Sequence, residues 1–157
     1  MQNAKLKKSD ARTIRVLLNG QESVVHSRSV QNTHRFAKKL VKELHGGDVL
    51  ALSGKLGAGK TTFVQGLAKA LGVKKQITSP TFVLMNIYAL LKSLNGITRL
   101  CHSDAYRLES ARELEAIGAQ EYISSPDTLT VIEWPERVKG LIPKNAIWIS
   151  FEHGGKV

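Results

Sequence analysis

Cysteine is nearly absent from this chain, since Cys101 is the only one in 157 residues. A single thiol cannot form an internal disulfide, and it gives little support to a cysteine-based metal site, so we expect a reducing compartment. The chain also lacks any run of about 18 apolar residues, and its basic N-terminus has no apolar core of the kind found in signal peptides. These absences predict a cytoplasmic protein that does not contact membranes.

Acidic residues are also few, with 13 Asp and Glu against 23 Lys and Arg, which gives a formal net charge of +10. Most of this excess lies in residues 1–45. A basic region of this kind favours contact with a polyanion such as RNA, but it is equally typical of a solvated tail that aids solubility. Both interpretations stay open at this point.

The composition is otherwise that of a globular protein, with 42% hydrophobic and 23% charged residues. The length suits one domain, so we predict a single domain over residues 1–157. Residues 1–12 are polar and aperiodic and are expected to form a loose basic arm. Residues 13–28 contain two strand-like runs on either side of Asn19-Gly20, a strong turn signal, and are expected to form a hairpin.

The residues from Gly54 to Thr61 read Gly-Lys-Leu-Gly-Ala-Gly-Lys-Thr and match the phosphate-binding pattern G-x-x-x-x-G-K-[ST] at every position. Backbone N–H groups at a helix start suit closely spaced phosphate oxygens, and glycine adopts backbone angles that a Cβ forbids. Lys60 is expected to reach the β- and γ-phosphates, and the Thr61 hydroxyl to bind a bridging Mg²⁺. The motif predicts a nucleoside triphosphate site.

The residues on either side of this motif agree with it. Residues 48–53 form a short apolar run typical of a buried strand, and apolar residues recur at helical spacing from Phe63 to Leu71. A strand followed by the glycine-rich loop and a helix is the context that the motif requires. A turn that binds nothing is the alternative, and the flanks disfavour it.

Other elements follow from local patterns. A helix is predicted from about Ser29 to Gly46, residues 89–96 are expected to be a connection, and residues 146–151 a last strand. Ser110 and Glu113 form a capping-box pattern for a helix that Gly118 can end.

A rigid corner is predicted after the helix, where the sequence reads Thr78-Ser79-Pro80-Thr81. Proline removes a backbone donor and biases the residue before it toward extended geometry. The hydroxyl groups of this corner could bind phosphate or metal-bound water. From spacing alone, a purely structural turn is the better interpretation.

Two carboxylates follow strand-like runs and are candidates for a metal-side acid. Asp104 comes after residues 97–101, and Glu133 comes directly after the buried run at 129–132. Ligands of parallel α/β sheets bind where strands end, and a carboxylate there can hold Mg²⁺ or orient a water molecule. The residues favour Glu133 over Asp104 without excluding either. Trp134 alone suggests core packing, and His102 a hydrogen-bonded structural role.

An ordered set of motifs runs across roughly residues 46–151. The set comprises Gly47-Asp48-Val49, the loop 54–61 with Thr62, Ser79-Pro80-Thr81-Phe82, His102-x-Asp104, Tyr106-Arg107-Leu108, Glu113-Leu114-Glu115 with Gly118, and Ile132-Glu133-Trp134 with Glu136. This set resembles the TsaE family, also called YjeE, the small bacterial ATPases of the tRNA threonylcarbamoyladenosine pathway. Phosphate loops occur in many families, but this ordered set is specific.

The resemblance implies a role for each matching residue. Nucleotide-binding residues would be Gly57, Ala58, Gly59, Lys60, Thr61 and Thr62, together with Thr33 from an N-terminal helix. Thr61 and Glu133 would hold Mg²⁺, and Asp104 would be the second essential carboxylate. Thr78, Ser79, Pro80, Thr81 and Trp134 would respond to the nucleotide or contact a partner.

The implied fold is α/β, a P-loop NTPase-like three-layer sandwich with a mostly parallel central sheet and helices on both faces. The implied activity is Mg²⁺-dependent hydrolysis of ATP to ADP in support of the TsaB and TsaD proteins. Contact with tRNA is expected to be indirect, with direct contact through the basic N-terminal region left open. The alternatives are a small-molecule kinase, although no arginine-rich lid is evident, and a nucleotide-gated binding module with incidental turnover.

Overall fold

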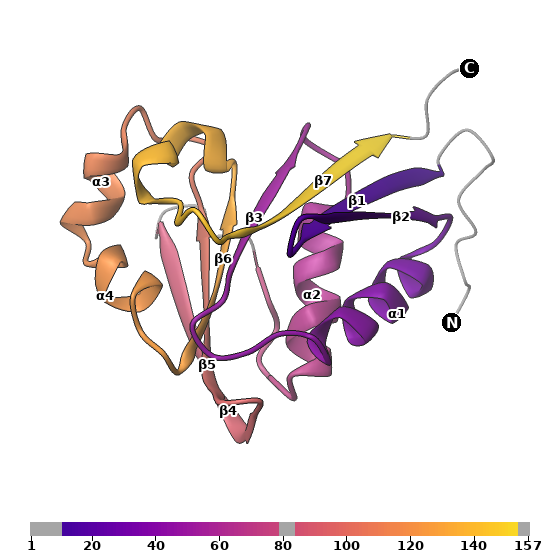
Figure 1. Ribbon diagram of the computed structural model, residues 1–157, viewed down its shortest axis with the longest axis horizontal. Helices are drawn as coiled ribbons and strands as arrows, with labels where there is room; N and C mark the ends of the chain where they lie inside the picture. Colours follow the sequence, from indigo (N-terminus) through magenta and orange to yellow (C-terminus); the bar gives the residue numbers. More distant parts are fainter. Residues whose placement is uncertain (1–10, 79–83, 154–157) are drawn as a thin grey trace.

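A computed structural model describes residues 11–78 and 84–153, which form one seven-stranded sheet covered by helices (Figure 1). The strands run in the order β2-β1-β7-β3-β6-β5-β4 across the sheet. Their bounds are β1 Arg12–Leu18, β2 Gln21–Ser27, β3 Val49–Gly54, β4 Met85–Leu94, β5 Ile97–Asp104, β6 Thr128–Glu133 and β7 Ile147–His153. The helices are α1 Val30–Val41, α2 Lys60–Ala70, α3 Ala111–Ala116, α4 Ala119–Ile123 and the 3-10 helix η2 Pro135–Leu141.

The sheet is mixed, so the prediction of a mostly parallel sheet holds only for its centre. Parallel pairing joins β7 to β3, β3 to β6 and β6 to β5, whereas β2, β1 and β4 add antiparallel pairs at the two sides. Two-residue turns at Asn19-Gly20 and Asn95-Gly96 connect β1 to β2 and β4 to β5, with positive φ at all four residues. Such short turns join only antiparallel neighbours.

The connection predicted for residues 89–96 was wrong, whereas the helix predicted after Ser110 is present as α3. Residues 89–94 continue β4 and are not a connection, because pairing with β5 extends them to the turn at Asn95. Gly118 does end α3, but its left-handed backbone also starts α4. Ser110 stands at the N-terminus of α3 without a side-chain capping bond, and Glu113 accepts the N–H of Glu109 instead.

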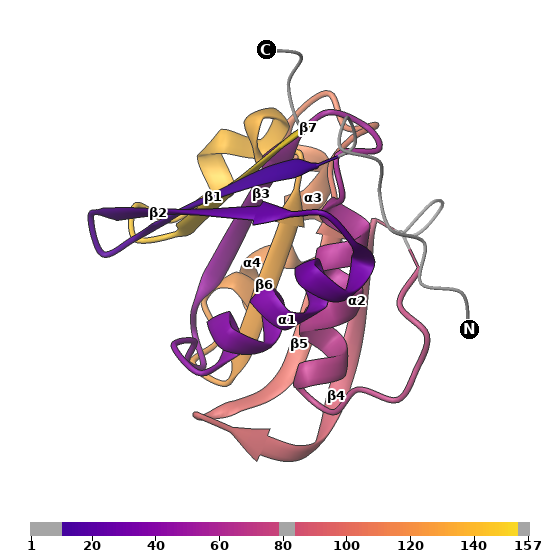
Figure 2. The ribbon, with the colours of Figure 1, turned by 90° about the vertical axis from the view of Figure 1, so that its right-hand side faces the viewer.

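Helices cover both faces of the sheet (Figures 1 and 2). On one face, α1 and α2 pack with Leu50 and Leu52 of β3 in the larger buried cluster. On the other face, α3, α4 and η2 pack with Val49 of β3 and Ile132 of β6 in the second cluster. Successive strand side chains point to opposite faces, so a continuously apolar strand supplies both clusters.

The carboxyl ends of three neighbouring parallel strands meet at one edge of the sheet. β3 ends at Gly54, β5 at Asp104 and β6 at Glu133, and the register pairs Asp104 directly with Glu133. The topology therefore brings the glycine-rich loop and both candidate carboxylates to the same edge. Within the described ranges, no helix is long and apolar enough to cross a membrane.

Helices α1 and α2 touch closely at Gly66. A Cβ at this position would lie 2.7 Å from Cδ2 of His34 and 2.9 Å from its Cα. Nearby, the ring of Phe63 packs against those of Phe36 and Phe151, at centroid distances of 5.7 and 5.5 Å. The helix that carries the loop is thus held against both α1 and the sheet.

We predict that Gly66→Ala destabilises the protein by about 1 kcal/mol, because overpacking costs about 1–3 kcal/mol while alanine regains up to about 1 kcal/mol of helix propensity. Urea unfolding measures the change. Gly140→Ala is the control, since a Cβ there meets no atom within 4 Å among the described residues. A Gly66→Ala protein as stable as the unmodified chain would contradict the close contact.

Candidate functional site

The loop between β3 and α2 requires its glycines. The backbone φ angles are 145° at Gly54, 77° at Gly57 and 109° at Gly59, all in the region that favours glycine. At Gly54, a Cβ would also lie 2.6 Å from the carbonyl oxygen of Phe151. Sequence and conformation therefore agree on a tight loop whose N–H groups lie at the start of α2.

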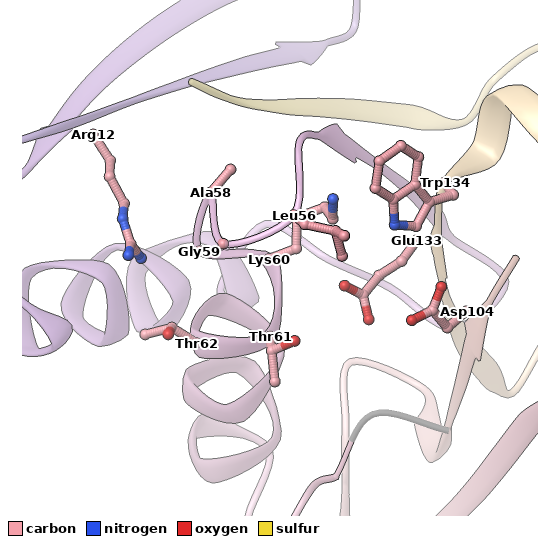
Figure 3. Close-up of a pocket in the computed structure, with 11 residues that line it drawn as sticks. Arg12, Leu56, Ala58, Gly59, Lys60, Thr61, Thr62, Asp104, Glu133 and Trp134 are labelled. Atoms are coloured by element: carbon pink, nitrogen blue, oxygen red, sulfur yellow. The ribbon is translucent and has the colours of Figure 1, made fainter. Parts of the chain in front are cut away.

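A cavity of about 220 Å³ opens beside this loop (Figure 3). Nine residues predicted from the sequence line it together: Gly57, Ala58, Gly59, Lys60, Thr61, Thr62, Asp104, Glu133 and Trp134. Arg12 and Leu56 complete the lining. Residues from four separate parts of the sequence thus surround one small space.

Other residues predicted for the site lie elsewhere or are not described. Thr33 is buried in α1, where its hydroxyl is 2.6 Å from that of Ser27, and it is not among the residues that line the cavity. Thr78 is exposed. Ser79, Pro80 and Thr81 lie outside the described residues.

Lys60 is the buried cation of the site, with only 5% of its surface exposed. Its ammonium donates to the carbonyl oxygens of Gly54 and Lys55 and lies 4.1 Å from the ring centroid of Trp134. Burial lowers the pKa of Lys60, although the nearby carboxylates of Glu133, Asp104 and Glu136 oppose that shift. The charge is held by dipoles and a π-face rather than by a paired carboxylate, which suits an incoming anion.

Glu133 is even more buried than Lys60, with 2% of its surface exposed, and a histidine fixes its direction. The imidazole Nε2 of His102 lies 2.7 Å from the Glu133 Oε2 atom, and both side chains are within the protein. His102 and Asp104 are two residues apart on β5 and so point to the same face. Strand β5 therefore supplies both a second carboxylate and the group that orients the first.

Asp104 is less buried and is held by the backbone. Its Oδ1 atom accepts the N–H of Tyr106 at 2.9 Å. Burial raises the pKa of the Asp104 carboxyl, and the neighbouring Glu133 carboxylate adds to this rise, while the Tyr106 N–H and Lys60 oppose it. A carboxylate with a raised pKa accepts a proton more readily, which suits a general base.

Trp134 follows Glu133 in a left-handed conformation that non-glycine residues seldom adopt, with φ 57° and ψ 51°. Its N–H donates to the carbonyl of Leu52 at 3.2 Å, and its ring centroid lies 4.9 Å from that of Tyr106. This fixed turn lays the indole beside Lys60. Trp134 is therefore part of the cavity wall and packs at the site rather than only in the core.

Comparison with known proteins identifies the family. A family model described as threonylcarbamoyl adenosine biosynthesis protein TsaE matches residues 27–156. The chain belongs to the TsaE family. That family acts in tRNA threonylcarbamoyladenosine biosynthesis.

Curated relatives and a solved structure agree with this assignment. The chain is 44% identical over 124 residues to TsaE of Treponema pallidum, covering 79% of this chain and 87% of the relative. It is 32% identical to TsaE of Borreliella burgdorferi, covering 80% and 87%. The crystal structure of YdiB from Bacillus subtilis superposes with a TM-score of 0.60 at 27% identity, covering 92% of this chain and 79% of that one.

Besides Leu56 of the loop, two residues of this TsaE-family site were not predicted for it from the sequence. His102 was expected to be a hydrogen-bonded structural residue, and it is one, but its partner is the candidate acid Glu133. The His-x-Asp spacing at a strand end was the available signal. Arg12 was assigned to the loose arm, and no local pattern separates it from the other basic residues there.

The described residues fit a magnesium ion that is held mainly by its ligand's phosphates. Within the described ranges, no group of three or more His, Cys, Asp or Glu side chains could hold a metal by itself. Mg²⁺ usually takes one or two protein oxygens together with phosphate oxygens and water. Thr61 and Glu133 both line the cavity and can supply such oxygens.

We predict that His102→Leu lowers the free energy of unfolding by about 1–3 kcal/mol, because it leaves the buried Glu133 carboxylate without its partner. Urea denaturation at neutral pH measures this. His102→Gln is the matched control, since its amide can still donate toward Glu133 and should restore part of the loss. Equal losses in the two variants would contradict a stabilising role for the hydrogen bond.

Proposed function

We propose that this chain is a Mg²⁺-dependent ATPase that hydrolyses ATP to ADP and phosphate in tRNA threonylcarbamoyladenosine biosynthesis. The observation that supports this most directly is the shared cavity, in which the glycine-rich loop and Lys60 face Asp104 and Glu133. Loop and cation suit phosphates, and two carboxylates suit metal binding and water activation. The site combines both requirements of phosphoryl transfer to water.

The loop and the first turn of α2 would bind the phosphates. The N–H groups of this turn point toward the cavity at the positive end of the helix dipole. Lys60 adds a full charge, which can exchange the carbonyls of Gly54 and Lys55 for phosphate oxygens at little cost because the ammonium is already desolvated. Ala58 and Thr62 also line the cavity.

The metal-side residues are Thr61 and Glu133. A bound Mg²⁺ would neutralise charge on the phosphate oxygens as the terminal group leaves. His102 holds the Glu133 carboxylate in one orientation. The carboxylate is therefore already in place before the nucleotide binds. Asp104 stands beside Glu133 and accepts a proton from the attacking water at its carboxylate, for which its raised pKa is suited.

Two substitutions test the hydrolysis. We expect Glu133→Gln and Asp104→Asn each to reduce phosphate release by at least about 100-fold, because each removes a charged group that acts on metal or water. Glu121→Gln is the matched control, since Glu121 on α4 is exposed and does not line the cavity. Release is followed with γ-labelled ATP.

The same assay separates the alternative activities. Label that moves to a metabolite rather than to water would favour a kinase. Partner function that persists in Glu133→Gln without any turnover would favour a nucleotide-gated binding module.

The partners we propose are TsaD and TsaB, with the nucleotide state controlling their affinity through the corner at residues 78–82 and through Trp134. Apolar and aromatic side chains at the cavity support contact with a protein at this place. Leu56 of the glycine-rich loop is 63% exposed, and the ring of Tyr106 packs at a tilt against Trp134, which lines the same cavity. A protein that covers these side chains would sense whether the cavity holds ATP or ADP.

We predict that Leu56→Asp weakens binding to TsaB and TsaD by at least about tenfold, since it places a charge in an apolar contact. Leu91→Asp is the control, because Leu91 is 76% exposed on β4 and lies apart from the cavity. Pull-down with ATP, ADP or no nucleotide supplies the measurement. Equal capture in all three states would contradict nucleotide control.

We place this activity in the cytoplasm and treat contact with tRNA as indirect, through TsaB and TsaD. Direct contact through the basic N-terminal region remains a second proposal. It is supported by the exposed basic side chains of α1, where Arg35, Lys38 and Lys39 gather on the outer surface. Phosphate contacts of this kind weaken with salt, which tRNA binding at two salt concentrations would reveal.

A further inference from the structure

Arg12 lies upstream of the segment that matches the family, yet it lines the same cavity as the family's motifs. It is the first residue of β1, where the register pairs it with Ser27 of β2 on one side and His153 of β7 on the other. Pairing on both sides fixes the backbone from which the side chain extends. Arg12 therefore belongs to the hairpin and not to the loose arm predicted for residues 1–12, and its position at the site is fixed by the sheet.

The Arg12 side chain packs onto the glycine-rich loop. A Cβ at Gly59 would lie 2.5 Å from its Nη1 atom and 3.2 Å from its Cδ atom. Only glycine at position 59 therefore leaves room for this arginine as it is placed. The guanidinium points toward the first turn of α2, near Thr62 (Figure 3).

The guanidinium also has unused hydrogen-bonding capacity. Its Nε atom is buried without a hydrogen-bond partner, and no ion pair within residues 11–78 and 84–153 includes Arg12. Arg15 on the same strand differs, since it is paired with Glu22 at 3.2 Å and Glu152 at 3.8 Å. A buried N–H without a partner is unfavourable, and the side chain that carries it lines a cavity which an anion could enter.

The position of Arg12 indicates which phosphate of the nucleotide its side chain would contact. Figure 3 shows Arg12 on the opposite side of the loop from Asp104 and Glu133, with Thr62 on its own side. If the terminal phosphate lies beside the two carboxylates, the phosphate nearest the nucleoside lies toward Thr62 and Arg12. This step rests on the proposed ATPase function.

We propose that Arg12 binds the α-phosphate of the nucleotide, so that the N-terminal hairpin contributes a phosphate ligand to the site. A guanidinium presents a planar fork of N–H donors that matches two phosphate oxygens. ATP and ADP share this phosphate, so the contact strengthens both complexes equally. The Arg12 contact would hold the nucleotide in place while the terminal phosphate is cleaved.

The test is calorimetric titration of the full chain with Mg²⁺-ATP and with Mg²⁺-ADP. Arg12→Ala is expected to raise the Kd for both nucleotides by about tenfold or more, as the loss of a charge-assisted hydrogen bond implies. Arg12→Lys should fall between Arg12→Ala and the unmodified chain, because it keeps the charge but loses the fork. The difference between Arg12→Ala and the unmodified chain should shrink as NaCl is raised.

Arg15→Ala is the matched control, since it removes an exposed arginine from the same strand without altering the cavity. Arg12→Gln, which removes the charge but keeps a polar side chain on the strand, provides a second variant that should also lose affinity for both nucleotides, should alanine disturb folding. Unchanged Kd values in Arg12→Ala and Arg12→Gln, a loss confined to ATP, or a loss that salt does not affect would each overturn the assignment. Failure of the unmodified chain and Arg15→Ala to bind either nucleotide would instead refute the proposed function.

Discussion

Parallel pairing of β3, β6 and β5 is the constraint on which the site depends, because strands that run in one direction end at the same edge of a sheet. The loop after Gly54 and the carboxylates of Asp104 and Glu133 meet there because the register aligns the three ends. A slip of one residue in β6 would turn Glu133 to the opposite face and separate it from His102. The two buried clusters, which require alternate residues of each strand on fixed faces, prevent such a slip.

The site concentrates charge in a partly buried space, and each charged group is held in a different way. Lys60 donates to loop carbonyls, Glu133 contacts His102, and Asp104 accepts a backbone N–H. Burying a charge is costly unless it is hydrogen-bonded or paired, so these contacts are what keep the groups in place. An anionic ligand with a divalent cation would balance the cations and the carboxylates at once.

The N-terminal hairpin is integrated into this architecture although most of it precedes the family match. Strand β1 pairs with β7 along most of its length and with β2 on its other side, so it extends the sheet rather than lying across it. The same pairing that extends the sheet also fixes the backbone of Arg12, from which the side chain extends toward the loop. The pairing of β1 therefore both extends the sheet and positions a residue of the site.

Local patterns in the sequence already determined the loop, the helix after it and the strands that carry Asp104 and Glu133. Glycines at positions that need positive φ, apolar strand runs and helical spacing act within a few residues, so they can be interpreted without knowing the fold. The Asn19-Gly20 turn belongs to the same class. The family resemblance then grouped the separate motifs into one expected site.

Only the tertiary structure decided which distant residues meet. The length of β4 depends on pairing with β5, and the mixed sheet depends on where β1 and β4 attach, neither of which periodicity records. The His102 contact with Glu133 spans 31 residues, and the approach of Arg12 to Gly59 crosses from the first strand to the loop. Such contacts depend on strand order and register, which are properties of the folded sheet and not of any local stretch of sequence.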